Sequence, residues 1–195
     1  MSIIGVCGLI GSGKGTVSDI LAELYGFESL SFADSLKDAV AAVFSWDRQL
    51  LEGATPESRE WREQVDLWWA NRLSIPDLTP RLMLQLWGTE VCRAGFHQDI
   101  WIASLERKIE QDKNYVIPDT RFPNEIDLIK KIGGSIWCVK RGPDPKWFVQ
   151  YQLGGSPPNY IHSSEWEWAR SKFDKTLAND GTLEDLKNLV QDHLV

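Results

Sequence analysis

Apolar and polar stretches alternate along the chain in a way that predicts strands followed by helices. The segment "SIIGVC" (2–7) is a short apolar run typical of a buried strand, and after it Val17, Ile20 and Leu21 recur at helical spacing. Gly26 is suited to end this helix. Four later segments have the character of short strands: residues 28–32, 114–119, 135–141 and 174–179.

Amphipathic segments with defined ends lie between these strands. Thr79 followed by Pro80 is a typical helix start, Asp99 is expected to cap the next helix, and Thr182 with Asp185 has the spacing of a capping box. Besides residues 15–26, the predicted helices are 35–44, 78–95, 99–111, 122–134 and 180–194, together with one inserted helix, "PESREWREQVDLWWANRL" (56–73).

This order of elements predicts an α/β fold with a mainly parallel, five-stranded sheet and helices on both faces. We expect a single domain, since 195 residues suffice to bury a core. A helical insertion at about 46–112 and a lid at about 142–170 interrupt the alternation; the lid is expected to contain at most a short helix near its end. Ligands should bind beyond the carboxyl ends of the strands.

The composition argues against several classes of partner. A net charge of −7 disfavours a nucleic acid polymer or an anionic membrane, because both require a basic face. No stretch approaches the roughly 20 apolar residues of a membrane span. The three cysteines (Cys7, Cys92 and Cys138) include no CxxC pair, so neither a disulfide framework nor a zinc site is indicated, and a reducing cytoplasm is expected.

The loop "GLIGSGKGT", between the first predicted strand and helix, is the strongest functional signal. Gly8, Gly13 and Lys14 fit the phosphate-binding pattern G-x-x-x-x-G-K-[ST], but Gly15 stands at the hydroxyl position and Thr16 supplies the hydroxyl one residue later. Glycines let successive backbone N–H groups turn toward one phosphate, and the lysine would bridge the outer phosphates. The "GxGKGT" form resembles the nucleoside monophosphate kinases of the P-loop superfamily, which favours phosphoryl transfer to a small acceptor.

A second signal is "PDTRFPNE", which ends the strand predicted at 114–119. Asp119 stands where a P-loop protein keeps an acidic residue near magnesium, and Arg121 offers a planar fork that can neutralise a phosphate. Glu125 is placed to orient that arginine. The alternative is a plain helix entry, in which Asp119 or Asn124 only caps.

Five motifs follow the P-loop in order: "FADSLK" (32–37), "LQLWGTEVCR" (84–93), "DTRFPNE" (119–125), "HSSE" (162–165) and "NDGTLEDL" (179–186). With the loop, they resemble the phage-type deoxynucleoside monophosphate kinase family across nearly the whole chain. The resemblance implies a P-loop NTPase fold of the nucleoside monophosphate kinase type. It also implies magnesium-ATP as donor, a deoxynucleoside 5′-monophosphate as acceptor and, for a phage-encoded protein, the host cytoplasm.

The resemblance also implies roles for individual residues. The catalytic set is Lys14, Arg121, Arg141 and Asp119. The ATP-binding set is Gly8, Gly11, Ser12, Gly13, Lys14, Gly15, Thr16, Asn179, Asp180 and Gly181, with the last three lining the adenine pocket. The acceptor-binding set is Phe32, Asp34, Lys37, Gln85, Arg93, Arg121 and Glu125. Magnesium would be held by Thr16 and Asp119, directly or through water.

Two other functions stay open. One is a related small-molecule kinase, such as a dephospho-coenzyme A kinase, although "DTRFPNE" and "LQLWGTE" argue against it. The other is a P-loop nucleotide-binding module without transfer chemistry. The sequence leaves the accepted bases and the roles of His162 and Glu165 undecided. The Trp-rich stretch at 57–73 is a candidate homodimer surface if its apolar side chains are exposed.

Overall fold

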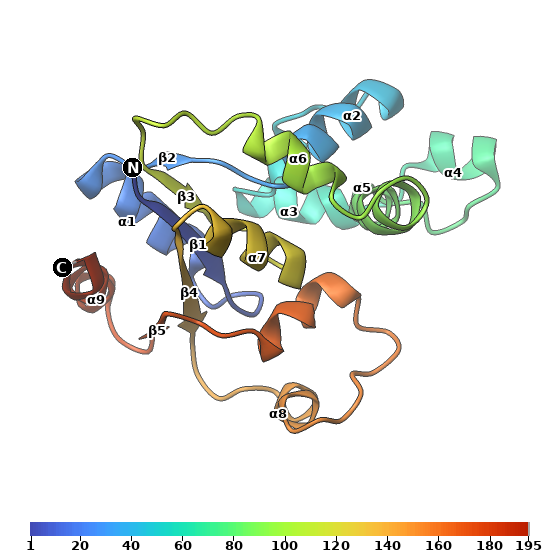
Figure 1. Ribbon diagram of the computed structural model, residues 1–195. Coiled ribbons are helices and arrows are strands. Elements are labelled where there is room, and N and C mark those ends of the chain that lie inside the picture. The colour runs from blue at the N-terminus through green and yellow to red at the C-terminus, as the bar shows by residue number, and fades with distance from the viewer. Residues whose placement is uncertain (195) are drawn as a thin grey trace. The chain divides into compact units, whose positions relative to one another are not determined.

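The computed structural model describes residues 1–194, and they form two compact units. Met1–Ser31 and the residues from Lys108 onward make up the sheet unit, and Phe32–Arg107 make up the helical unit. The helical unit thus begins and ends earlier in the chain than the insertion expected at 46–112. Figure 1 shows the elements of both units.

The sheet unit contains the parallel sheet that the sequence predicts. Among residues 1–194 its strands are β1 (Ile3–Cys7), β2 (Glu28–Ser29), β3 (Tyr115–Ile117), β4 (Ser135–Lys140) and β5 (Lys175–Ala178). They lie in the order β2-β3-β1-β4-β5, and every neighbouring pair is parallel. Their carboxyl ends therefore share one edge, and the loops that leave that edge are the ones expected to bind a ligand.

Helices pack on the sheet because each presents one apolar face. The helices of this unit are α1 (Lys14–Tyr25), α7 (Pro123–Lys131), α8 (Lys146–Gln152) and α9 (Leu183–Leu194). Leu21 of α1 and Val190 of α9 are fully buried in a core that also contains Val6 of β1 and Val139 of β4. Figure 1 shows α7 on the opposite side of the sheet from α1. The predicted capping box starts α9, since the Thr182 N–H donates to Asp185 at 2.8 Å.

The segment expected to be a lid has more structure than its sequence indicates. The helix α8 lies near its beginning, and two 3₁₀ turns, Ser163–Glu165 and Glu167–Arg170, lie near its end, so the expectation of at most a short helix near the end was wrong. Phe148 and Trp168 are almost completely buried, with ring centroids 5.4 Å apart. Aromatic packing orders this segment despite its Gly and Pro content.

The helical unit consists of short helices around a tryptophan cluster. Its elements are α2 (Asp34–Phe44), η1 (Leu50–Glu52), α3 (Pro56–Glu63), α4 (Leu67–Leu73), α5 (Pro80–Gln85), the π-helix η2 (Leu86–Ala94) and α6 (Ile100–Glu106). The single helix predicted at 56–73 is two helices. The chain turns at Gln64, and Asp66 starts α4 by accepting hydrogen bonds from the Trp68 and Trp69 N–H groups, both at 3.1 Å.

Other predicted ends of helices in this unit are confirmed in part. Thr79 caps α5 by accepting a hydrogen bond from the Leu82 N–H at 3.1 Å. Asp99 occupies the position before α6 but makes no side-chain capping bond there. No helix in residues 1–194 is long and apolar enough to cross a membrane.

Candidate active site

The loop between β1 and α1 has the backbone of a phosphate cradle. Gly8, Gly11 and Gly13 have φ values of 150°, 79° and 104°, which side chains other than glycine rarely adopt. A Cβ on Gly11 or Gly15 would meet nothing within 4 Å, so the approach to the loop is open there. Successive N–H groups are thereby free to turn toward one anion.

Neighbouring strands hold this loop from behind. The side chain of Asn179, which follows β5, donates to the Ser12 carbonyl at 2.8 Å and is itself buried. A Cβ on Gly8 would lie only 2.4 Å from the carbonyl oxygen of Val139 in β4. The buried hydroxyl of Ser12 has no hydrogen-bond partner in the described part of the chain. A polar group left in this state is a candidate ligand contact, because burial without a partner is costly.

Lys14, the first residue of α1, folds back over the loop. Its Nζ donates to the carbonyl oxygens of Gly8 and Leu9 at 2.8 and 2.9 Å. Burial, followed by repulsion from Arg121, lowers the pKa of Lys14 to about 8, while Glu165 acts in the opposite direction. The lysine therefore shares its surroundings with a second cation, and both would gain from an anion between them.

The loop after β3 contributes an acid and an arginine. The Asp119 carboxylate accepts a hydrogen bond from the Ser31 hydroxyl at 2.6 Å. Arg121 donates through Nη1 to Oε1 of Glu165 at 2.7 Å. Glu125 is buried, and its Oε2 accepts from the backbone N–H groups of Arg121 at 2.6 Å and Phe122 at 3.1 Å. Glu125 thus shapes the turn that carries Arg121 by binding its backbone. The carboxylate that pairs with the Arg121 guanidinium belongs to Glu165.

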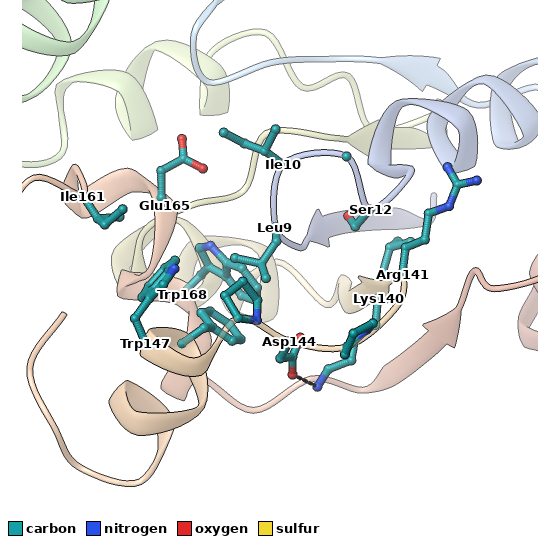
Figure 2. Close-up of a pocket in the computed structure, with 15 residues that line it drawn as sticks. Leu9, Ile10, Ser12, Lys140, Arg141, Asp144, Trp147, Ile161, Glu165 and Trp168 are labelled. Carbon is teal, nitrogen blue, oxygen red and sulfur yellow. Dashed lines mark hydrogen bonds and ion pairs between the residues drawn. The ribbon is translucent and has the colours of Figure 1, made fainter. Parts of the chain in front are cut away.

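A cavity of about 370 Å³ lies beside the loop. The P-loop residues 9–12, the end of β4 and the lid segment line it. Figure 2 shows Glu165 and Ile161 of the lid on one side, with Lys140 and Arg141 on the opposite side. Lys140 pairs with Asp144 at 3.0 Å, whereas Arg141 is exposed. The three residues predicted to line an adenine pocket, 179–181, do not line this cavity.

The loop at 179–181 is instead tied to the end of the neighbouring strand β4. The Asn179 N–H donates to the Lys140 carbonyl at 2.7 Å, and Oδ1 of Asp180 accepts from the Gly142 N–H at 2.6 Å. With the bond from the Asn179 side chain to the Ser12 carbonyl, these bonds connect the start of the segment at 142–170 to the P-loop through residues 179 and 180.

In the helical unit, the residues predicted to bind the acceptor fall into two places. Asp34 and Lys37 lie one turn apart on α2, and Arg48 and Glu52 connect them. Lys37 pairs with Glu52 at 2.5 Å, and Arg48 lies 3.5 Å from Asp34 and also pairs with Glu52. Although burial raises the pKa of Glu52, hydrogen bonds from Lys37 and Arg48 lower it overall.

The other predicted acceptor residues lie on the helices that follow. Gln85 ends α5, and Arg93 lies in η2, where its buried side chain donates to the Gln98 carbonyl at 3.1 Å. Phe32 is also buried. Each of these assignments stays a prediction.

Two contacts among the candidate site residues escaped the sequence reasoning. Nothing in the local pattern singles out Arg48 as the partner of α2. Glu165 belongs to the "HSSE" motif, but its pairing with Arg121 joins residues 44 positions apart and has no local signature. His162, in the same motif, starts the 3₁₀ turn, with its Nδ1 2.9 Å from the Ser164 hydroxyl.

A parallel sheet with a glycine loop and a lysine after its central strand defines a P-loop NTPase fold. A mimivirus protein (Acanthamoeba polyphaga mimivirus), named "Putative deoxynucleotide monophosphate kinase", is 32% identical over 200 residues that cover 95% of this chain and 92% of that protein. The chain belongs to the deoxynucleotide monophosphate kinase family. The deoxynucleoside-5′-monophosphate kinase of Escherichia phage T5 is 46% identical over 56 residues, 28% of this chain and 22% of that protein.

Solved structures with a similar arrangement are more distant. Shikimate kinase from Aquifex aeolicus has a TM-score of 0.49 at 14% identity, over 98% of this chain and 95% of that one. Dephospho-CoA kinase from Campylobacter jejuni has a TM-score of 0.44 at 16% identity, over 99% and 95%. No family model matches the chain. The fold assignment therefore rests on the strand order and the loop themselves.

Proposed function

We propose that this protein is a deoxynucleoside monophosphate kinase. It transfers the γ-phosphoryl group of ATP to a deoxynucleoside 5′-monophosphate and yields the diphosphate and ADP. The observation that carries the proposal is the placement of two cations at the carboxyl edge of one parallel sheet: Lys14, which folds over the loop after β1, and Arg121, which follows the neighbouring strand β3. A phosphoryl group between them would neutralise both, and family membership supports the choice of acceptor.

The P-loop would hold the phosphates of ATP. Its positive-φ glycines and the unpartnered hydroxyl of Ser12 fit a bound polyphosphate. Lys14 would leave its two carbonyl partners for the outer phosphates. Asn179, Asp180 and Gly181 remain the proposed adenine side, and the bond from Asn179 to the Ser12 carbonyl supports their closeness to the loop.

The oxygen donors near the loop fit magnesium. Thr16 offers a half-buried hydroxyl in the first turn of α1, and Asp119 offers a carboxylate whose orientation the Ser31 hydroxyl supports. Magnesium is commonly held by one or two carboxylates together with substrate phosphates, so a single Asp is an adequate protein contribution. When bound, the ion would bridge phosphate oxygens and neutralise their charge.

The acceptor phosphate needs positioning more than activation. It is already ionised at neutral pH, so Asp34 would orient the acceptor and has no need to remove a proton. The other proposed acceptor contacts are Phe32, Lys37, Gln85, Arg93, Arg121 and Glu125. Of these, Glu125 would act by shaping the turn that carries Arg121.

Charge neutralisation and exclusion of water would then supply most of the rate. As the bond from phosphorus to the ADP oxygen breaks and the bond to the acceptor oxygen forms, Lys14, Arg121 and Arg141 would stabilise the transferring group. The segment at 142–170 would act as a lid that keeps water from competing as acceptor. Its aromatic packing supports movement as a unit.

We also propose a homodimer that acts in a reducing cytoplasm, the host's if the protein is phage-encoded. Leu67 and Trp68 on α4 are 71% and 63% exposed, which supports the Trp-rich stretch as a contact surface. A light-scattering mass of one chain would refute the dimer. Cys7, Cys92 and Cys138 are free thiols, as such a compartment permits.

The test is a coupled ADP-release assay with magnesium-ATP and each deoxynucleoside and ribonucleoside monophosphate, with dephospho-coenzyme A as the competing acceptor. Arg121→Ala should lower turnover by roughly 10³-fold, which leaves a residual rate to measure. Arg107→Ala, which removes an exposed arginine outside the Trp-rich stretch, is the matched control. Turnover only with dephospho-coenzyme A would replace the proposed acceptor. ATP binding without turnover on any acceptor would leave a nucleotide-binding module.

A further inference from the structure

The guanidinium of Arg121 is held by one edge. Its Nη1 donates to Glu165 Oε1 at 2.7 Å and more weakly to the Ser164 hydroxyl at 3.4 Å. Within residues 1–194, its Nε and Nη2 groups make no hydrogen bond. A guanidinium binds a phosphate best through two parallel N–H groups, so the fork that remains is the one a phosphoryl group would use.

The two partners differ in exposure. The side chain of Arg121 is 37% exposed, whereas that of Glu165 is only 15% exposed. The Glu165 carboxylate is therefore the more buried partner, and the Arg121 guanidinium is the partner that a ligand can reach. Glu165 also lines the cavity beside the P-loop, together with Leu9 and Ile10.

The turn that carries Glu165 is itself anchored. The backbone N–H of Glu165 donates to the His162 carbonyl at 3.0 Å. The indole N–H of the next residue, Trp166, donates to the Ile161 carbonyl at 3.1 Å. The Trp166 ring packs edge-on against Tyr151 of α8 at 4.9 Å. Aromatic contacts with the lid helix thus hold the carboxylate in place, which is the condition for orienting another side chain.

From these contacts we propose that Glu165 is the positioning residue for Arg121: it fixes the guanidinium through Nη1 so that the Nε and Nη2 edge faces the transferring phosphoryl group. This rests on the proposed kinase function. Glu165 makes no contact with substrate in this scheme and acts only through the arginine. The pairing also makes the orientation of Arg121 depend on the position of the lid.

A double-mutant cycle tests the proposal. Glu165→Ala should lower kcat for the best deoxynucleoside monophosphate by roughly 10- to 100-fold, as expected for a misplaced catalytic group, with little change in the KM for ATP. Glu165→Gln, which keeps an acceptor for Nη1, should recover part of kcat. In an Arg121→Ala background, Glu165→Ala should have no further effect, since the residue it positions is absent.

Glu23→Ala, which removes an exposed carboxylate on α1, is the control and should leave kcat unchanged. The proposal would be overturned if Glu165→Ala lowered kcat by the same factor in the presence and absence of Arg121. It would also be overturned if Glu165→Ala left kcat unchanged in an otherwise wild-type enzyme that is active. Absence of wild-type turnover on every monophosphate would overturn the proposed function and this inference together. Losses that appear only with Arg121 present, and that Glu165→Gln partly reverses, would establish it.

Discussion

Three glycines in the phosphate loop and the first turn of α1 should respond differently to the same added methyl group. Gly8 has a φ of 150°, and its Cβ would lie 2.4 Å from the Val139 carbonyl oxygen. Gly11 also has a positive φ, 79°, but its Cβ would meet nothing within 4 Å. Gly15 has no such φ and equally open space. The three alanine variants therefore separate backbone strain from collision with a neighbouring strand.

The expected magnitudes follow from these two costs. Gly11→Ala should cost about 1–2 kcal/mol, because only the left-handed backbone is strained. Gly8→Ala should cost about 2–6 kcal/mol, because a backbone strain of about 1–3 kcal/mol is joined by overpacking of similar size against a carbonyl that cannot rotate away. Gly15→Ala should be neutral or stabilising by up to about 1 kcal/mol, since alanine favours the helix.

Thermal unfolding followed by far-ultraviolet circular dichroism, without nucleotide, measures the three effects. For a chain of this size, 1 kcal/mol corresponds to a change in Tm of about 2–4 °C. Gly8→Ala should therefore melt about 5–20 °C below wild type, Gly11→Ala a few degrees below it, and Gly15→Ala at or above it. If Gly8→Ala and Gly11→Ala melted together, the close packing of the loop against β4 would be refuted.

Two further predictions concern charge and burial. Burial raises the pKa of Glu52, but hydrogen bonds from Lys37 and Arg48 outweigh burial and lower it below 4.5. The ionised Glu52 therefore stabilises the folded protein above pH 4.5, and this stabilisation is lost as the pH falls through the pKa that Glu52 has in the folded state. Glu52→Gln should thus lower the free energy of unfolding at pH 7 by on the order of 1 kcal/mol after solvent screening. The difference in Tm between this variant and wild type should disappear in acid. An equal difference in Tm at pH 7 and pH 3 would contradict this prediction. Burial raises the pKa of all three thiols, that of Cys138 to about 11, but Cys7 and Cys138 are fully buried whereas Cys92 is only half-buried. A thiol reagent at pH 8 should therefore label native protein only at Cys92. Rapid labelling of the Cys92→Ser variant would contradict the prediction that only Cys92 reacts.

Local sequence was enough to predict the elements that depend on neighbouring residues. The alternation of strand and helix, the P-loop before α1, the start of α5 at Thr79 and the capping box at Thr182 each depend on residues within a few positions of one another. The family resemblance, which uses the order of whole motifs, is confirmed by the mimivirus relative.

Sequence reasoning was wrong in two places, once because a local helix cap was overlooked and once because contacts between distant residues decided the outcome. Asp66 competes for backbone N–H groups and divides the helix expected at 56–73. In the segment at 142–170, Phe148 and Trp168 bury each other across 20 positions and stabilise a helix that the Gly and Pro content disfavours.

The candidate site shows the same division. By itself the sequence determined the class of fold, the phosphate loop and the arginine after β3, because each is a short pattern with a direct physical meaning. Only the tertiary structure decided that Glu125 shapes the turn while Glu165 pairs with the guanidinium, and that Asn179 holds the loop from behind. The reason is that hydrogen bonds and ion pairs form between side chains that folding brings together, and their separation along the chain leaves no periodic signal.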